Sequence, residues 1–292
     1  MRNKFINLLI NHNKKTKNKS FLLVGDVGYS VIEDFEQLYP QYYLNVGVAE
    51  QNMASLAAGI ASEDNSVFIY SIANFPTFRA AEQIRNTIDY HNYNVTVVAI
   101  GGGLEYGNLG YSHHAIQDYG LMRLFPNMTI LSPGDDEELE DVFYFCVKQK
   151  GPKYLRLSKK KSFNYKKKRV NQHFNLLHKH SNAKTALIST GRISYEASKQ
   201  NRFKESDIYS CPIWGERYKK KISAILKKYK IVYCMEDHLP SSGFGSFLAE
   251  CCIEHCPDTK IKRFSLSNSI IGKVGTEQEL WSYSNFDQLK IE

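Results

Sequence analysis

The sequence predicts an α/β protein with two three-layer α/β/α domains and mainly parallel sheets. Continuous apolar runs at 21–25, 66–72 and 94–100 are typical of strands that are buried on both faces of a parallel sheet. These runs alternate with segments rich in helix-forming residues, which is the pattern of βα units. A second series of this kind begins at 185, and 292 residues are enough for two domains of ordinary size.

The first domain is expected to cover residues 1–158 and to open with a helix over 2–12. A strand–turn–helix unit is expected around Gly47, because β-favouring residues give way there to helix formers. Two later helices are expected to end near Tyr90 and Gln149, the second of them opening on a proline and several acids. Strands are expected at residues 21–25, 42–46, 66–72, 94–100, 128–131 and 154–158.

Residues 159–182 are rich in Lys, Arg, His and Asn and lack a hydrophobic period. This composition predicts a basic linker between the two domains. Residues 183–292 are predicted to form the second α/β domain, with a helix that begins near Glu196. Further elements expected in this domain are strands within 185–191 and 230–238 and a helix from 242 to about 252.

Composition and charge exclude several classes of protein. Hydrophobic residues make up 42% and charged residues 23%, as in soluble globular proteins. No apolar run approaches the roughly 20 residues that span a bilayer, and no signal-peptide pattern is present, so we expect a cytoplasmic protein with no membrane partner. The net charge of +8 suits anionic sugar phosphates, but no nucleic-acid motif accompanies it, so no nucleic-acid partner is expected. We interpret the cluster Cys251, Cys252 and Cys256 as buried free thiols and not as a metal site, with zinc as the alternative.

Glu50 lies in the first turn of the helix predicted after Gly47, where the helix dipole favours a negative charge. Its neighbours Val48, Ala49 and Met53 are apolar. A carboxyl group in such surroundings can share a proton with a ligand. Acidic residues are also common in first turns for dipole reasons alone, so the rest of the chain must decide between the two interpretations.

The stretch 47–53, G-V-A-E-Q-N-M, resembles the G-[IV]-A-E-Q-N-M signature of the pyrimidine-binding domain of transketolases and 1-deoxyxylulose-5-phosphate synthases. The resemblance implies thiamine diphosphate as the cofactor. It also implies a catalytic and cofactor-binding role for Glu50, whose carboxylate hydrogen-bonds the aminopyrimidine ring in that family. This contact shifts the ring to its imino form, which removes the proton from the thiazolium C2 carbon.

Further positions match the family at the ends of predicted strands. Asp26 matches a cofactor-binding Asp, and Ser30 matches a Ser that contacts substrate phosphate. Phe75 matches the Phe that stacks on the aminopyrimidine, whereas Phe78 stands where transketolases have a Tyr that touches the pyrimidine amino group. Arg79 resembles an Arg that deoxyxylulose-phosphate synthases use for substrate phosphate. Without this match, the same residues would be interpreted as turn, cap and core residues.

The loop 104–117 carries His113, which aligns with a transketolase His that polarises substrate carbonyl and hydroxyl groups. The resemblance therefore implies that His113 is catalytic and binds substrate, with His114 as a second substrate-binding candidate. Leu109 stands where the family has an Asp that contacts a sugar hydroxyl, which favours a deoxy or otherwise modified sugar. Lys159 takes the place of a phosphate-binding Arg, as a cation without the bidentate fork.

The second domain also carries a family marker. The motif 236–238, E-D-H, followed by G-F-G-S at 243–246, resembles the transketolase C-terminal domain, which implies a scaffold role for Glu236 and His238. The G-D-G motif with which the family holds Mg²⁺ against the diphosphate is missing. The resemblance thus covers the back two-thirds of a transketolase. It implies a partner chain that carries the diphosphate-binding domain and the Mg²⁺ ligands, in an assembly of two heterodimers.

The sequence therefore predicts a subunit of a transketolase-like transferase that moves a two-carbon ketol unit between sugars or sugar phosphates. One alternative is a subunit similar to 1-deoxyxylulose-5-phosphate synthase or to the 2-oxoacid dehydrogenase β chain. The other is a non-catalytic scaffold homologue. Glu50 and Phe75 argue against the scaffold, whereas Leu109, Phe78 and Lys159 keep it open.

Overall fold

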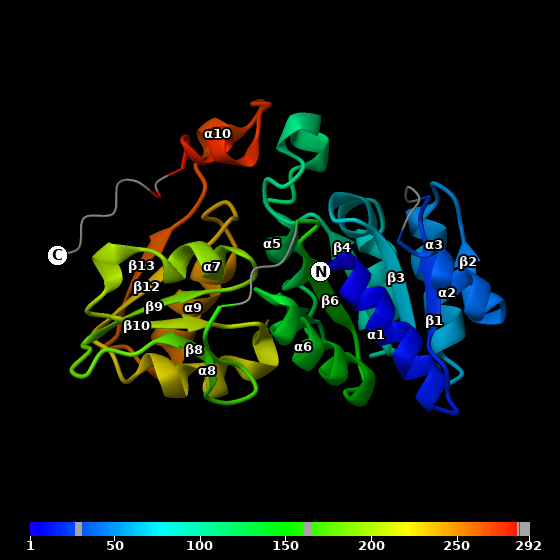
Figure 1. Ribbon diagram of the computed structural model, residues 1–292, viewed down its shortest axis with the longest axis horizontal. Helices are drawn as coiled ribbons and strands as arrows, with labels where there is room; N and C mark the ends of the chain where they lie inside the picture. Colours follow the sequence, from blue (N-terminus) through cyan, green and yellow to red (C-terminus); the bar gives the residue numbers. More distant parts are fainter. Residues whose placement is uncertain (27–30, 161–164, 285, 287–292) are drawn as a thin grey trace.

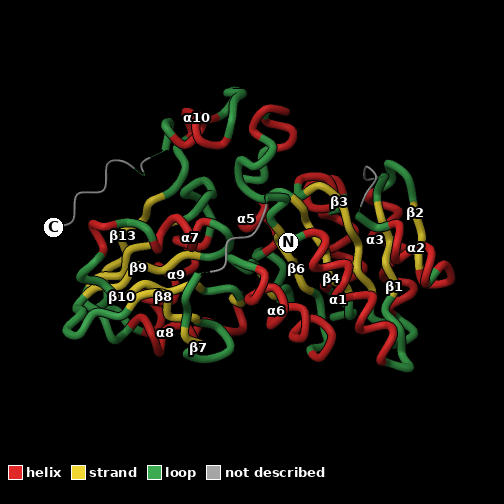
Figure 2. Tube along the Cα trace, in the orientation of Figure 1, coloured by secondary structure: helices red, strands yellow, loops and turns green. Residues whose placement is uncertain are grey.

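The structure is a computed structural model that describes residues 1–292 except 27–30, 161–164, 285 and 287–292. It contains two mainly parallel sheets, which lie at the left and at the right of Figure 1 with helices packed around each. The colours of Figure 2 show the same alternation of strands and helices along the chain. The predicted α/β class is therefore confirmed.

The first sheet has seven strands in the order β11-β5-β6-β4-β3-β1-β2. All of its strand pairs are parallel except β5–β11. Every residue of β4 is buried, as a continuous apolar, β-branched run in the middle of a parallel sheet should be. The strands are β1 (Phe21–Val24), β2 (Tyr43–Asn45), β3 (Val67–Ile72), β4 (Val95–Ile100), β5 (Thr129–Leu131), β6 (Lys153–Leu157) and β11 (Ile213–Trp214).

Helices cover both faces of the first sheet. α1 packs against α6, whereas α3 packs against β3 and the α4–η3 segment. The helix that the sequence predicts up to Tyr90 is mostly π-helical, because η2 and η3 flank only one short α-helical turn. The helices are α1 (Arg2–Lys15), α2 (Glu33–Leu38), α3 (Glu50–Ala61), α4 (Ala81–Gln83), α5 (Asp118–Met122) and α6 (Asp136–Lys148), with 3₁₀ turns η1 (Pro40–Tyr42), η4 (Gly107–Leu109) and η5 (Tyr111–His113) and π-helical segments η2 (Phe75–Arg79) and η3 (Ile84–Asp89).

The second sheet has six strands in the order β13-β12-β9-β10-β8-β7. α8 and α9 pack together, and α9 contacts β12 and β13, while α7 contacts β9 and β10. The strands are β7 (Lys168–Arg169), β8 (Asn175–His178), β9 (Thr185–Ser189), β10 (Asp207–Ser210), β12 (Ile231–Met235) and β13 (Lys260–Phe264). The helices are α7 (Ile193–Ser198), α8 (Lys219–Leu226), α9 (Phe244–His255) and α10 (Glu277–Trp281), with 3₁₀ turns η6 (Asn201–Phe203), η7 (Glu216–Tyr218) and η8 (Asn268–Ile270).

The predicted basic linker, residues 159–182, needs correction. Its second half contributes β7 and β8, which pair with each other antiparallel and extend the second sheet through β10. Both residues of β7 are exposed and basic, so no hydrophobic alternation marks this strand in the sequence. These strands instead place the second half of the segment within the second α/β unit.

The two units share a core, and the chain crosses between them more than once. Trp214 belongs to β11, which leaves the second unit and pairs with β5 of the first sheet. Its ring is fully buried and lies 5.3 Å from the ring of Tyr119 and 5.0 Å from that of Phe244, centre to centre. Burial of so large an aromatic group between the units stabilises their contact by several kcal/mol, at roughly 25 cal/mol per Å² of apolar surface.

A buried ion network lies at the same boundary. The Arg156 guanidinium, on β6, lies 3.0 Å from a carboxylate oxygen of Asp118 and 2.7 Å from one of Asp237. It also donates to the carbonyl of Ala115 at 2.6 Å and stacks on Tyr119 at 4.2 Å. Because Asp118 begins α5 in the first unit and Asp237 follows β12 in the second, this one side chain fixes the two units to each other.

The six cysteines are all free and buried, which confirms the prediction of buried thiols. Among the residues that the structure describes, no group of His, Cys, Asp and Glu side chains is arranged to hold a metal ion. No helix in the described part of the chain is both long and apolar enough to cross a bilayer.

Candidate cofactor site

The candidate site lies where β2, β3 and β4 end on the first sheet. These strands are parallel, so their carboxyl ends share one edge, where ligands collect in α/β folds. The chain after β2 leads to Glu50, the chain after β3 leads to Phe75 and Arg79, and the chain after β4 leads to His113. The structure thus brings together four of the residues that the sequence predicts.

Glu50 is positioned by a tight turn between β2 and α3. Gly47 has φ = +67°, a conformation that favours glycine, and its N–H donates to the side chain of Asn45 at 2.9 Å. Its carbonyl accepts from the N–H of Ala49 at 2.9 Å. The helix then begins at Glu50, as predicted, and the side chain is only 5% exposed.

Arg79 connects Glu50 to Phe75. Its guanidinium donates to Oε1 of Glu50 at 2.9 Å, and its Cζ lies 4.2 Å from the centre of the Phe75 ring. The Arg79 side chain is 47% exposed, so the contact opens to solvent on one side. A planar group with N–H donors therefore fits between the Glu50 carboxylate and the Phe75 ring.

His113 stands beside this group on the turn η5. Its ring lies 5.1 Å from that of Phe75, edge to face, and its Nδ1 lies 3.0 Å from the Ser112 hydroxyl. Burial lowers the pKa of the His113 imidazole, and the neighbouring His114 and Arg79 lower it further. The ring is thus neutral at pH 7 and can exchange hydrogen bonds with a carbonyl or hydroxyl group.

His114 has a different environment from His113. Its ring is buried, and Nε2 lies 3.1 Å from the carbonyl of Gly107 within the same loop. Its own carbonyl accepts from the Asn74 side chain at 2.9 Å. In this structure His114 therefore supports the loop that carries His113, and its contact with a substrate stays a prediction.

Lys159 approaches the site through an aromatic ring. Its ammonium group lies 3.8 Å from the centre of the Tyr106 ring, and that ring lies 6.2 Å from the ring of His113. Burial lowers the pKa of the Lys159 ammonium. The backbone N–H of Lys159 donates to Glu105 at 2.7 Å, which fixes the start of this segment.

The remaining predicted residues lie at the margin of the site. Asp26 lies two residues after β1, is exposed and has φ = +31°, a conformation that few non-glycine residues adopt. Phe78 is 46% exposed, and Leu109 is 55% exposed. Ser30 lies outside the described residues. The structure therefore places Asp26 and Phe78 at a solvent-facing edge and leaves their contacts with a ligand as predictions.

Sequence reasoning missed two supporting residues. Asn74 donates from one amide group to the carbonyls of Ser112 and His114, at 3.1 and 2.9 Å, and so ties the end of β3 to the histidine loop. Tyr106 provides the ring between Lys159 and His113. Neither residue carries a spacing signal, because both act through contacts made across 30 or more positions or within an irregular loop.

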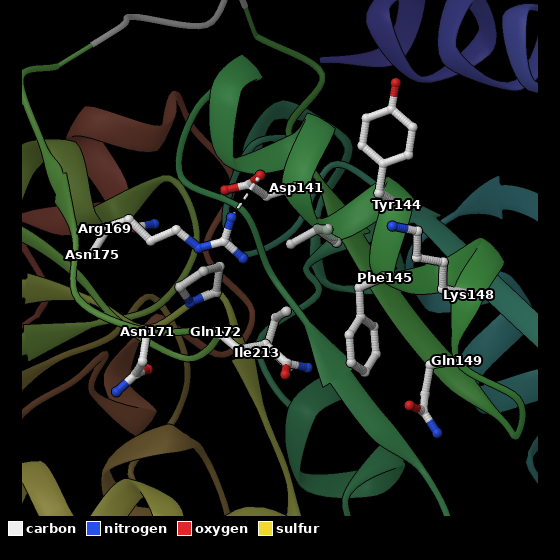
Figure 3. Close-up of a pocket in the computed structure, with 12 residues that line it drawn as sticks. Asp141, Tyr144, Phe145, Lys148, Gln149, Arg169, Asn171, Gln172, Asn175 and Ile213 are labelled. Carbon is white, nitrogen blue, oxygen red and sulfur yellow. Dashed lines mark hydrogen bonds and ion pairs between the residues drawn. The ribbon is translucent and has the colours of Figure 1, made fainter.

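The most prominent cavity of the surface lies elsewhere. A groove of about 440 Å³ runs between α6 and the segment that carries β7 and β8. Figure 3 shows its lining, in which Arg169 pairs with Asp141 at 3.2 Å. None of the predicted site residues lines this groove.

Residues 3–163, more than half of the chain, match the family described as "Transketolase, pyrimidine binding domain". The chain belongs to the transketolase family. The matched segment contains every candidate residue of the site, from Asp26 to Lys159.

Relatives of this transketolase-family chain extend over its full length. It is 30% identical over 292 residues to the "Putative transketolase C-terminal section" of Methanocaldococcus jannaschii, which covers 98% of this chain and 92% of that protein. It is 28% identical over 264 residues to one of the subunits of an apulose-4-phosphate transketolase from Actinobacillus succinogenes, with 88% and 84% covered. A solved structure described as "Split gene transketolase, inactive beta4 tetramer" has the same fold, with a TM-score of 0.82, 24% identity, and 96% of this chain and 92% of that chain covered.

Proposed function

We propose that this chain is the pyrimidine-binding subunit of a two-chain transketolase. The enzyme would transfer a two-carbon ketol unit between sugars or sugar phosphates, with thiamine diphosphate as cofactor. The observation that carries the proposal is the cluster of Glu50, Phe75 and His113 at one edge of a sheet whose sequence matches the pyrimidine-binding family.

The residues present fit an aminopyrimidine ring. Glu50 offers a nearly buried carboxylate, and Phe75 offers an aromatic face to the same space. The guanidinium of Arg79, which is planar and carries N–H donors, already lies between them. A planar ring with an amino group needs the same two partners, a carboxylate acceptor and an aromatic surface.

Thiamine diphosphate, when bound, supplies a nucleophilic carbon for the carbonyl group of the sugar. Glu50 would share a proton with the pyrimidine at its carboxylate, and its low exposure keeps water away from that contact. Phe75 would orient the ring by stacking. His113, neutral at pH 7, would hydrogen-bond the sugar carbonyl or hydroxyl group. Lys159 and Arg79 would contribute positive charge for a substrate phosphate.

A partner chain is part of the proposal. The sequence lacks a G-D-G motif, so the ligands for Mg²⁺ and diphosphate would come from a second polypeptide. Apolar side chains close to Glu50 in the chain are exposed: Leu44 is 44%, Val48 71% and Leu56 37% exposed. Exposed apolar groups that gather beside a site favour a protein partner. Two copies of each chain would complete the assembly. The names of the relatives, one a C-terminal section and the other one of several subunits, support a divided enzyme.

The test is cofactor binding by calorimetry, first on this chain alone and then on the chain co-expressed with a candidate diphosphate-domain chain. We expect thiamine diphosphate with Mg²⁺ to bind only to the pair. Glu50→Gln should lower turnover of the pair by about 10²- to 10⁴-fold, which is the usual contribution of a positioned proton-transfer group. Glu63→Gln is the matched control, because this exposed carboxylate lies just beyond α3 and should leave turnover unchanged.

The alternative functions predict different results. A non-catalytic scaffold would bind no thiamine diphosphate with any partner, and Glu50→Gln would then change nothing. A deoxyxylulose-phosphate synthase-like subunit would consume pyruvate and release CO₂, which ketol transfer does not. The exposed Leu109, in place of a sugar-binding Asp, favours an acceptor that lacks or replaces one hydroxyl, so deoxy and modified sugars belong in the first substrate panel.

A further inference from the structure

Arg79 makes both of the contacts that the pyrimidine ring would need. Its guanidinium donates to Oε1 of Glu50 at 2.9 Å and covers a face of the Phe75 ring at 4.2 Å. One carboxylate oxygen and one ring face cannot serve a guanidinium and an aminopyrimidine at the same time. Either Arg79 moves when the cofactor binds, or the cofactor does not use this pair of residues.

We propose that Arg79 is a displaceable latch, which holds Glu50 and Phe75 together until the pyrimidine ring of thiamine diphosphate takes over both contacts. This inference rests on the proposed function. The latch keeps the buried carboxylate paired with a cation before the cofactor arrives. It also makes cofactor binding an exchange of one planar partner for another.

The contacts of Arg79 are strong enough to order the site and weak enough to be released. Its side chain is 47% exposed, while that of Glu50 is 5% exposed, so the pair has one wet and one dry partner. Ion pairs and cation–π contacts at such half-exposed positions are individually weak, so that each one changes an equilibrium by only a few-fold.

Release of the guanidinium also has a direction. Arg79 ends the π-helical segment η2, and its charge is close enough to His113 to affect that imidazole. A guanidinium that leaves Glu50 therefore stays on the histidine side of the site and faces solvent. There it can pair bidentately with an anionic group of the substrate, which a lysine could not do.

The experiment uses the two-chain enzyme and measures the affinity and the association rate of thiamine diphosphate, by calorimetry and stopped flow. Arg79→Met removes the competing contacts while it keeps an unbranched apolar side chain. We expect about 3- to 10-fold tighter binding and a correspondingly faster association, because the competing ion pair and cation–π contact no longer have to be broken. Arg85→Met is the matched control, since it removes an equal charge from an exposed position on the following segment η3.

A second measurement tests the latch in this chain alone. Unfolding in urea of the wild type, Glu50→Gln, Arg79→Met and the double variant gives the coupling between the two side chains. We expect a coupling of about threefold in the folding equilibrium constant, as for half-exposed ion pairs. Coupling near onefold would overturn the inference whatever the cofactor does.

The outcomes separate the latch from the function. If wild type and Arg79→Met bind thiamine diphosphate equally well, the latch is wrong and the proposed function stands. If Arg79→Met binds more weakly than the Arg85→Met control, Arg79 holds the cofactor and is not a latch. If no assembled form binds the cofactor, both the function and the latch are refuted.

Discussion

Replacement of Arg156 by Met should destabilise the whole chain, because this side chain neutralises two buried carboxylates at once. Asp118 is fully buried and Asp237 is 6% exposed, and the guanidinium lies within 3.0 Å of both. It also donates to the carbonyl of Ala115, in the loop that carries the histidines. Loss of Arg156 leaves both carboxylates and this carbonyl without their partner.

The size of the effect follows from the burial of the network. Removal of one partner of a buried ion pair costs about 3–5 kcal/mol, because the remaining charge is uncompensated. A native chain has about 5–15 kcal/mol of stability in total, so Arg156→Met should remove a large share of it. Urea unfolding should give this loss directly, and Tm should fall by about 10 °C. Arg169→Met is the control: its ion pair with Asp141 is about half exposed, and its loss should cost about 1 kcal/mol or less.

A rescue experiment distinguishes lost charge pairing from lost packing. Asp118→Asn and Asp237→Asn, added to Arg156→Met, remove the two uncompensated charges and should restore a good part of the stability. If Arg156→Met costs no more than Arg169→Met, the buried network does not hold the two units together and this reasoning is refuted. If the added Asn substitutions destabilise further, packing and not charge explains the loss.

Three further predictions concern the site and the second domain. Gly47→Ala, at φ = +67°, should cost about 1 kcal/mol and weaken cofactor binding because it disturbs the turn before α3. Gly59→Ala, within α3 and in open space, should instead stabilise by up to about 1 kcal/mol, and urea unfolding of both variants checks this difference. Burial raises the pKa of the Glu236 carboxyl from 4.5 to about 8, so the folded chain binds more protons than the unfolded chain between these values. Stability should therefore fall as pH rises through this window, by about 1.4 kcal/mol per pH unit relative to Glu236→Gln, and parallel curves for the two proteins would contradict the assignment. Arg79→Met should raise the pKa of His113 toward its ordinary value, and an unchanged NMR titration of that ring would place the guanidinium too far away to act on it.

The central strands and the start of the key helix could be predicted from sequence because local signals agree there. β3 and β4 are continuous apolar runs flanked by turn residues, and the structure buries nearly all of their side chains. At Glu50, a glycine that permits positive φ is followed by strong helix formers, and the helix begins at that residue. In these places local preference and global fold specify the same structure.

The parts that sequence reasoning missed depend on contacts between distant segments. β7 has only two residues, both charged, and exists because Lys168 pairs with Leu176 of β8. β11 is equally short and pairs with a strand more than 80 residues earlier, which no local pattern specifies. The contact of Arg79 with Glu50 depends on a side-chain conformation at the end of a π-helical turn. None of these features leaves a period in the sequence.

The edge that carries Glu50 gives up local stability that other parts of the chain retain. α6 and α10 begin with side-chain caps, from Asp135 and Thr276, whereas α3 begins after Ala49 without one, a difference worth about 1 kcal/mol. Asp26, just after the neighbouring strand β1, has a positive φ that is unfavourable for a non-glycine residue. A Ser or Asp at position 49 would cap α3, but it would also offer the helix N–H groups and the ligand a second oxygen next to Glu50. Such unfavourable local features persist where function requires them, and their gathering around Glu50 is an argument for an active subunit over a scaffold.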